Sequence, residues 1–233
     1  MTVSNKRALD IFNDMQLDII RGVYPPRSKL PPERELAEKY KTSRFAIREA
    51  MAMLAQMGYV ETVPQSGTLV RDFMTEGTLD VLVQVMKIRG ALDPALTQSL
   101  LRYRYTLETQ AAGDAAANLS PEDLLALRAL IETKARSLGD VALQSQCDYD
   151  IHFRLVSASR NLISIIIFRS FVPVYKTMTD LFYSLPGAPE RSLALNKKLL
   201  RALEKRDAEG ARKAMGDILL YAEKRVMERM MAG

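Results

Sequence analysis

The chain contains very little of the residue types on which catalytic and metal sites depend. Its 233 residues include a single cysteine, Cys147, and a single histidine, His152. One cysteine excludes an intramolecular disulfide and any cysteine-rich zinc site. The sequence also lacks a glycine-rich phosphate loop and offers no combination of residues from which a catalytic triad could be assembled. We therefore expect a protein that is not an enzyme.

Long apolar runs are also missing. The N-terminus lacks the apolar stretch of a signal peptide, and no segment has the roughly 20 apolar residues that a membrane-spanning helix needs. The longest candidate, residues 162–168, ends at Arg169 and is interpreted as a core segment of a helix. Internal repeats and low-complexity segments are absent too. The lack of a signal peptide and of a membrane-spanning segment predicts a cytoplasmic protein.

The composition itself is that of an ordinary globular protein, with 48% hydrophobic and 26% charged residues. This length allows one or two domains. Strand signals are confined to the first part of the chain, and helical periodicity dominates the rest. We predict a mainly α fold with a three-helix and β-hairpin domain over residues 1–73, a linker over 71–77, and an all-α domain over 78–233. That second domain has about seven expected helices, at 78–90, 94–117, 121–138, 141–159, 162–184, 190–206 and 208–230.

Several of these helices have recognisable ends. Asp93, Ser120 and Asp207 each stand directly before a helical segment, as N-cap residues do. Pro173 interrupts the segment 162–184 and is expected to kink it.

The stretch from Pro31 to Gly67 organises the first domain. Residues 6–20 form a preceding helix, with Ala8, Ile11 and Met15 among the apolar residues at helical spacing. A short helix then begins after Pro32, and Ser43 is a suitable N-cap for the next one. This last helix carries an apolar stripe of Ile47, Met51 and Leu54.

The residues of this helix that lie off the apolar stripe indicate that the protein binds a nucleic acid. Arg44, Phe45 and Arg48 face away from the apolar side. Between Arg27 and Arg48 there are seven Lys or Arg residues and three Glu residues, a local excess of four positive charges. An isolated pair of arginines is more often only the solvated face of a helix, but such an excess is expected where a protein contacts phosphates. We interpret the helix as a recognition helix that enters the major groove with its N-terminus first.

A β-hairpin follows the recognition helix. Residues 58–63 and 68–70 are β-formers on either side of the turn Pro64-Gln65-Ser66-Gly67. A hairpin in this position is a wing, whose tip can reach an adjacent groove.

These motifs resemble the winged helix-turn-helix of the GntR family of bacterial transcription regulators. The resemblance covers about the first 73 residues and rests on Pro32-x-Arg34-Glu35-Leu36-Ala37, Ser43-Arg44-x-x-x-Arg48-Glu49-Ala50, Gly58-Tyr59-Val60-Glu61 and Gly67-Thr68-x-Val70. It implies DNA contacts by Arg34, Ser43, Arg44, Arg48 and the wing glycine Gly67. The usual Gly-x-Gly of the wing is replaced here by Gln65-Ser66-Gly67, so Gln65 becomes a further candidate for a polar contact with DNA.

In the second domain, the most informative pair is Asp148 and His152. The two residues are four apart and therefore share one face of a helix. Carboxylate and imidazole together suit a divalent first-row metal, so the pair could be half of a metal site. The simpler alternative is a structural Asp–His pair, and the chain has no second histidine with which to complete a site.

The helical half resembles the effector domain of the FadR subfamily of GntR regulators, through residues 101–108, Asp148-x-x-x-His152 and Ala158-Ser159-x-Asn161. Many members of that subfamily hold a metal with one Asp and three His beside a small carboxylate ligand, and others sense fatty acyl-CoA without a metal. The third and fourth ligand positions fall near Asn196 and Ile218 here, so the usual set is incomplete.

Candidate effector contacts are Arg104, Asp148, Tyr149, His152 and Asn196. Arg104 lies between Leu100, Leu101 and Leu107, and an inward-pointing arginine needs an anion or a carboxylate partner. That partner could be the effector, or equally Glu108 or Asp148. Tyr149 could line a pocket or belong to the core.

Together these features predict a ligand-responsive transcription regulator. It would bind a palindromic operator as a homodimer, because two-fold DNA symmetry matches two-fold protein symmetry. A fatty acid, its acyl-CoA or a small carboxylate would modulate DNA affinity from the helical domain. The alternative is a non-catalytic architectural DNA-binding protein.

Overall fold

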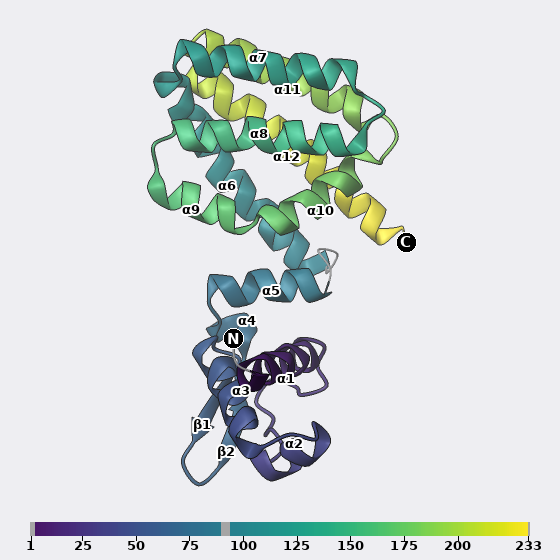
Figure 1. Ribbon diagram of the computed structural model, residues 1–233. Helices are drawn as coiled ribbons and strands as arrows, with labels where there is room; N and C mark the ends of the chain where they lie inside the picture. The colour runs from purple at the N-terminus through teal and green to yellow at the C-terminus, as the bar shows by residue number, and fades with distance from the viewer. Residues whose placement is uncertain (1–2, 90–93, 233) are drawn as a thin grey trace. The chain divides into compact units, whose positions relative to one another are not determined.

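The computed structural model describes residues 3–89 and 94–232, with side chains from residue 6 onward. In these ranges the chain forms twelve helices and one two-stranded sheet (Figure 1). The contacts divide the chain into two compact units, residues 1–90 and 91–233. The mainly α fold, with the strands confined to the N-terminal part, confirms the predicted fold class.

Three helices build the core of the first unit: α1 (Val3–Ile20), α2 (Glu33–Lys39) and α3 (Arg44–Gln56). Their buried residues repeat at helical spacing, so each helix directs one apolar face inward. Residues that are entirely withdrawn from solvent include Met15 and Ile19 of α1, Leu36 of α2, and Ile47 and Leu54 of α3.

Helix α3 begins where the sequence predicted. The Ser43 side chain accepts a hydrogen bond from the backbone N–H of Ala46 over 3.3 Å, which confirms Ser43 as the N-cap. The apolar stripe differs in one position. Ala50 is buried beside Ile47 and Leu54, whereas Met51 is only half-buried.

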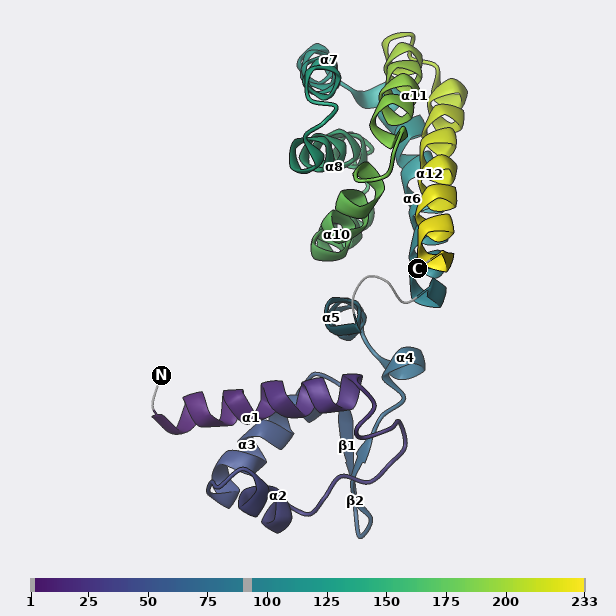
Figure 2. The ribbon, with the colours of Figure 1, turned by 90° about the vertical axis from the view of Figure 1, so that its right-hand side faces the viewer.

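The wing consists of β1 (Val60–Val63) and β2 (Gly67–Val70), which pair antiparallel with Val60 opposite Val70. The turn between them places two residues at positive φ, Gln65 at 64° and Gly67 at 92°. Glycine adopts such angles without steric cost, whereas glutamine does so less readily. The three helices and this hairpin form the predicted winged helix-turn-helix (Figure 2).

The segment predicted as a linker contains a short helix instead. Helix α4 (Phe73–Glu76) buries Phe73, whose ring meets the Tyr59 ring edge-on with centroids 6.1 Å apart. The following helix α5 (Leu79–Arg89) contacts α1 and α4 and is grouped with the first unit. The expected linker therefore packs in part against the winged helix-turn-helix, and the boundaries 1–73 and 78–233 stay a prediction.

In the second unit, residues 94–232 form seven helices. They are α6 (Pro94–Asn118), α7 (Pro121–Arg136), α8 (Val141–Ala158), α9 (Leu162–Ser170), α10 (Val172–Tyr183), α11 (Ala188–Glu204) and α12 (Ala208–Met231). Helices α6 and α12 lie side by side in both views (Figures 1 and 2). Small buried residues at this contact, Ala112, Ala115 and Ala116 of α6, let the two helices approach closely.

The helix caps of this unit follow the sequence signals. Ser120 and Asp123 form a capping box at the start of α7, and Asp207 accepts a hydrogen bond from the backbone of Gly210 at the start of α12. Both predicted N-caps are confirmed. The third, Asp93, lies outside the described residues.

The predicted helix 162–184 is broken into α9 and α10, which meet at an angle of 65° around Phe171. Pro173 stands in the first turn of α10, as the predicted kink requires. The interpretation of residues 162–168 as a core segment is confirmed for Phe168, which is buried in a core cluster, but is wrong for Leu162, Ile163 and Ile166, which are exposed. Leu162 is 73% exposed and Ile163 is 65% exposed, because α9 packs mainly against α8 and α10 and buries one side.

Among the described residues, none of the helices taken singly is both long and apolar enough to cross a membrane. Helices α9 and α10 reach that length and apolarity only when they are counted together across their bend.

Candidate functional site

The first candidate site is the exposed side of α2 and α3. Helix α3 keeps its buried residues on one face, so its first turns present Arg44, Phe45 and Arg48 to solvent, with Phe45 62% exposed. Arg34 of α2 and Ser43 are exposed as well. An exposed aromatic ring between two arginines suits a nucleic-acid surface, on which the ring can contact a base and the arginines can contact phosphates or guanine.

Two of these arginines have carboxylate partners in the protein alone. Arg48 Nε lies 2.7 Å from Glu33 Oε2, and Arg34 Nε lies 3.8 Å from Glu38 Oε1. Such exposed pairs contribute at most about 1 kcal/mol each. DNA phosphates can therefore displace the carboxylates. Arg44 makes no ion pair or hydrogen bond with any residue that the structure describes.

Ser43 and the wing contribute polar groups to the same unit. The Ser43 hydroxyl oxygen is engaged in capping α3, which leaves its proton free to be donated to a phosphate. Gln65 and Gly67 lie exposed in and beside the turn of the hairpin. All seven residues predicted to contact DNA are thus accessible on the winged helix-turn-helix, and their contacts with DNA stay a prediction.

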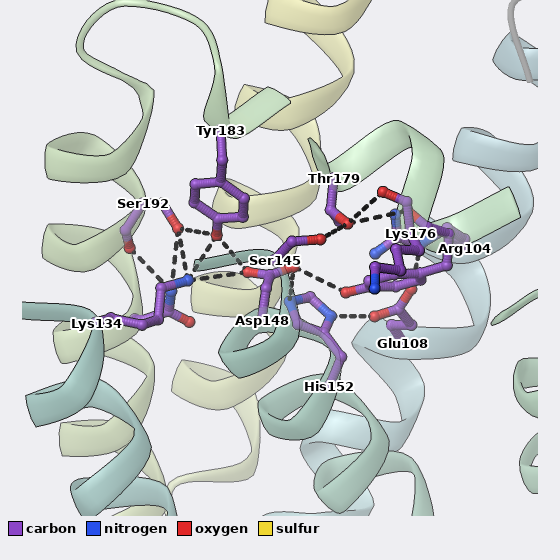
Figure 3. Close-up of polar contacts among 12 residues, drawn as sticks. Arg104, Glu108, Lys134, Ser145, Asp148, His152, Lys176, Thr179, Tyr183 and Ser192 are labelled. Atoms are coloured by element: carbon purple, nitrogen blue, oxygen red, sulfur yellow. Dashed lines mark hydrogen bonds and ion pairs between the residues drawn. The ribbon is translucent and has the colours of Figure 1, made fainter. Parts of the chain in front are cut away.

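The second candidate site is a group of buried polar side chains in the helical unit (Figure 3). Arg104 donates a hydrogen bond of 2.6 Å to Oε1 of Glu108, one turn later on α6. The other oxygen of Glu108 contacts Nδ1 of His152 on α8. Arg104 also lies over the Tyr175 ring of α10, with the guanidinium carbon 4.2 Å from the ring centroid.

These contacts fix the charges of the Arg104 and Glu108 side chains. Burial by itself would raise the pKa of Glu108, but the charges of Arg104 and His152 together lower it. Burial likewise works against the charged form of Arg104, yet the neighbouring Glu108 carboxylate raises the pKa of Arg104 above its usual value. A guanidinium and a carboxylate are therefore held as a buried ion pair.

On the other side of His152, Asp148 accepts three hydrogen bonds. Tyr183 donates to Oδ1 over 2.5 Å, Tyr175 donates to Oδ2 over 2.8 Å, and Lys134 donates to Oδ1 over 3.1 Å. Burial opposes the charged carboxylate, but the charge of Lys134, that of His152 and the two tyrosine hydroxyls hold the pKa of Asp148 well below its usual value. Asp148 is therefore ionised in the folded protein.

A cavity of about 20 Å³ adjoins this polar group. Arg104, Asp148 and His152 form part of its lining, while Met178 and Phe182 of α10 belong to its apolar wall. This volume is enough for a single water molecule. The Nε2 atom of His152 is buried and has no hydrogen-bond partner among the described residues, so the site contains one polar atom that remains to be satisfied.

Two of the predicted effector residues do not line this cavity. Tyr149 stacks on Phe153 and Phe168, with both pairs of ring centroids 5.7 Å apart, and so belongs to an aromatic cluster. Asn196 is fully buried and donates hydrogen bonds to the backbone oxygen and hydroxyl of Ser192. The structure thus brings Arg104, Asp148 and His152 together at one cavity, and a role for Tyr149 or Asn196 in binding stays a prediction.

Sequence reasoning missed Lys134 and Ser192 as members of this site. Lys134 is fully buried, and it continues the stripe of Leu127 and Ile131 on α7 at offsets of four and seven. A lysine on an apolar stripe was the available signal, because a buried ammonium requires a carboxylate partner. Glu108 had been named only as one possible partner of Arg104.

Asp148 and His152, predicted as half of a metal site, form hydrogen bonds with other side chains instead. Among the described residues, no three His, Cys, Asp or Glu side chains are grouped so as to hold a metal ion. The Nε2 atom of His152 is 3.7 Å from Oδ2 of Asp148, but both carboxylate oxygens already accept hydrogen bonds. Asn196 faces Ser192, and Ile218 lines the cavity as an apolar residue.

Comparison with known proteins identifies both units. The model of the bacterial regulatory proteins of the gntR family matches residues 7–70, and the FCD domain matches residues 99–220. The HTH-type transcriptional regulator Mce2R of Mycobacterium tuberculosis is 30% identical over 222 residues, covering 94% of this chain and 90% of the relative. The fatty acid metabolism regulator protein of Proteus mirabilis is 30% identical over 186 residues, covering 80% and 76%.

A solved structure has the same fold. Escherichia coli McbR/YncC is 20% identical, with a TM-score of 0.53 over 96% of this chain and 98% of that one. The winged helix-turn-helix, the FCD domain and the similarity to regulators over most of the chain lead to one conclusion: the chain belongs to the gntR family of bacterial regulatory proteins, and it is a DNA-binding regulator of transcription and not an enzyme.

Proposed function

We propose that this regulator binds a palindromic operator as a homodimer and that a small carboxylate bound beside Arg104 changes its affinity for DNA. Two-fold symmetric operators present the same bases to both protomers of a two-fold dimer. Because the partner is chromosomal DNA, we place its action in the bacterial cytoplasm.

The DNA side of the proposal rests on α3. Its exposed N-terminal turns carry Arg44, Phe45 and Arg48, and its opposite face is fixed in the core by Ile47 and Leu54. Inserted into the major groove, this helix would read bases through the arginines. The wing would place Gln65 and Gly67 against the neighbouring backbone.

The effector side rests on the composition of the cavity. One part of its lining is polar and includes Arg104, His152 and Ser192, and the rest is apolar and includes Met178 and Ile218. An amphipathic anion suits both parts, with its carboxylate at Arg104 and its carbon chain toward α10 and α12. Glu108 accepts a hydrogen bond from one N–H of the guanidinium, so an effector carboxylate would share Arg104 with Glu108 through the remaining N–H donors.

The size of the cavity favours a short effector. A volume of about 20 Å³ is far below the roughly 300 Å³ at which pockets for drug-sized ligands begin. Even a few-carbon acid would require the apolar wall to move outward, and an acyl chain would require a larger rearrangement of that wall. The name of the Proteus mirabilis relative connects that protein with fatty acid metabolism, so medium and long chains belong among the probes.

The effector would act by preferring one arrangement of the dimer. A ligand shifts DNA affinity only by the difference between its affinities for the DNA-competent and incompetent states. The single observation that carries the effector proposal is the buried Arg104 at a cavity that His152 also lines, with an Nε2 atom that has no hydrogen-bond partner in the described parts of the chain.

The test is to select DNA from a random pool with purified protein and then to titrate the selected duplex with lactate, citrate, octanoate or palmitoyl-CoA present. The proposal expects a palindromic consensus, two chains per duplex, and a change of DNA affinity with at least one probe. Binding without sequence preference and without any response to these probes would instead identify an architectural DNA-binding protein.

A further inference from the structure

Among the described residues of the helical unit, Lys134 is the most deeply buried charged side chain. Its side chain has no exposed surface, and its ammonium group donates to Oδ1 of Asp148 at 3.1 Å, to the Tyr183 hydroxyl at 2.6 Å and to the Ser192 hydroxyl at 3.2 Å. An ammonium has three N–H donors, and all three are used here. Figure 3 shows these three oxygen ligands converging on one nitrogen from α8, α10 and α11.

Asp148, in turn, has little capacity left for another cation. A carboxylate has about four lone-pair positions, and three accept hydrogen bonds from Lys134, Tyr175 and Tyr183. The remaining direction faces Nε2 of His152 at 3.7 Å. Among the residues that the structure describes, no third His, Cys, Asp or Glu is grouped with these two so as to hold a metal ion.

The charge balance of the site also opposes a metal ion. Lys134 is paired with Asp148, and Arg104 is paired with Glu108, so each buried carboxylate already has a cation as its partner. A divalent ion would add two positive charges to a region where effective dielectric screening is weak. The residues that are present therefore do not fit the metal that the FadR-type resemblance implies.

We propose that the Lys134 ammonium is the resident cation of this domain, holding the Asp148 carboxylate by an internal ion pair where such domains can use a divalent metal. Lys134 then neutralises and positions the buried Asp148 carboxylate, and the helical domain needs no metal ion for this. This inference does not depend on the DNA sequence or on the identity of the effector.

The direct test is metal retention by the purified full-length protein. The protein is first stripped with EDTA, then dialysed separately against Zn²⁺, Ni²⁺ and Mn²⁺, desalted and analysed for metal per chain. We expect less than about 0.1 ion per chain and an unchanged Tm after stripping, since an ion that binds only the folded state would raise Tm. Retention of one ion per chain that is lost in both Asp148→Asn and His152→Gln would overturn the proposal.

Paired variants test the role of Lys134 itself. Lys134→Met removes the charge at similar length and leaves Asp148 buried without its cation, so Tm should fall by roughly 10 °C. Adding Asp148→Asn to that variant should recover a large part of the loss, because no buried carboxylate then remains there. Lys213→Met, an exposed position on α12, is the matched control.

An equal loss of Tm in the single and double variants would mean that Lys134 acts only by packing, which contradicts the proposal. If Lys134→Met does not fold, the metal measurement on the wild-type chain decides alone.

Discussion

Arg104 and Glu108 lie one turn apart on α6 and form a hydrogen bond of 2.6 Å, with only 11% and 1% of their side chains exposed. A guanidinium has five N–H donors, so Arg104 can bind a second carboxylate while it keeps its hydrogen bond to Glu108. An effector carboxylate would therefore share Arg104 with Glu108, and this relationship connects the stability of the domain with ligand binding.

The first prediction separates these two roles of Arg104. Arg104→Ala leaves the Glu108 carboxylate buried without its cation and should lower the free energy of unfolding by about 3–5 kcal/mol. Arg104→Ala combined with Glu108→Gln removes both charges and should regain much of that stability. The double variant should still bind DNA but lose the response to the active carboxylate probe. If the folded double variant still responds normally to the probe, Arg104 does not bind the effector.

The second prediction concerns how the stability of the protein depends on pH through Asp148. The pKa of Asp148 is lowered in the folded state, chiefly by Lys134, whereas its unfolded value is about 3.9. The unfolded chain therefore binds a proton that the folded chain does not. The Asp148 contribution to stability is complete above about pH 5 and is lost as the pH falls toward the folded pKa.

The measurement is the difference in Tm between the wild type and Asp148→Asn between pH 7 and pH 3. The wild type should be the more stable at pH 7, and the difference should shrink steadily on acidification. A difference that is independent of pH would show that Asp148 is not ionised in the fold.

The third prediction tests the recognition helix. Arg44→Ala should weaken binding to the selected duplex by about 1–3 kcal/mol if Arg44 reads a base. If Arg44 contacts a phosphate, affinity should fall on all sequences and the salt slope should decrease by about 1. Lys87→Ala, on the exposed side of α5, removes one positive charge outside the winged motif and should change neither. Equal effects of the two substitutions would contradict the assignment of α3.

The fourth prediction uses the ion pair of Arg48. Because Glu33 holds Arg48 at 2.7 Å, Glu33→Gln should free the guanidinium and remove a negative charge beside the DNA. DNA affinity at low salt should rise by roughly 2- to 5-fold, in line with the value of about 0.5–1 kcal/mol for an exposed pair. Unchanged or weaker DNA binding by a fully folded variant would argue that Arg48 does not reach the duplex.

Local signals allowed the fold to be predicted well. Ser43, Ser120 and Asp207 mark helix starts through contacts within a few residues, and Pro173 marks the bend between α9 and α10. The exposed face of α9 was not foreseen, because an apolar run such as that around Ile163 does not reveal which neighbours will cover it.

The buried site was predicted only in part, for a related reason. The spacing of Asp148 and His152 placed them on one face of α8, but Lys134 reaches Asp148 across 14 residues and Ser192 across 58. Periodicity describes the face of a helix and not its partners. The charged residues on apolar faces, Lys134 and Glu108, are the signals that would have extended the prediction.

The most direct test of the account is the reciprocal coupling between effector and operator. The affinity of the wild-type protein for the selected duplex is measured with and without the active carboxylate probe, and the affinity for that probe is measured with and without the duplex. Linkage requires the two affinities to change by the same factor, and we predict a factor of about 5–150. A probe that binds the FCD domain with the same affinity whether or not the duplex is bound would contradict the account.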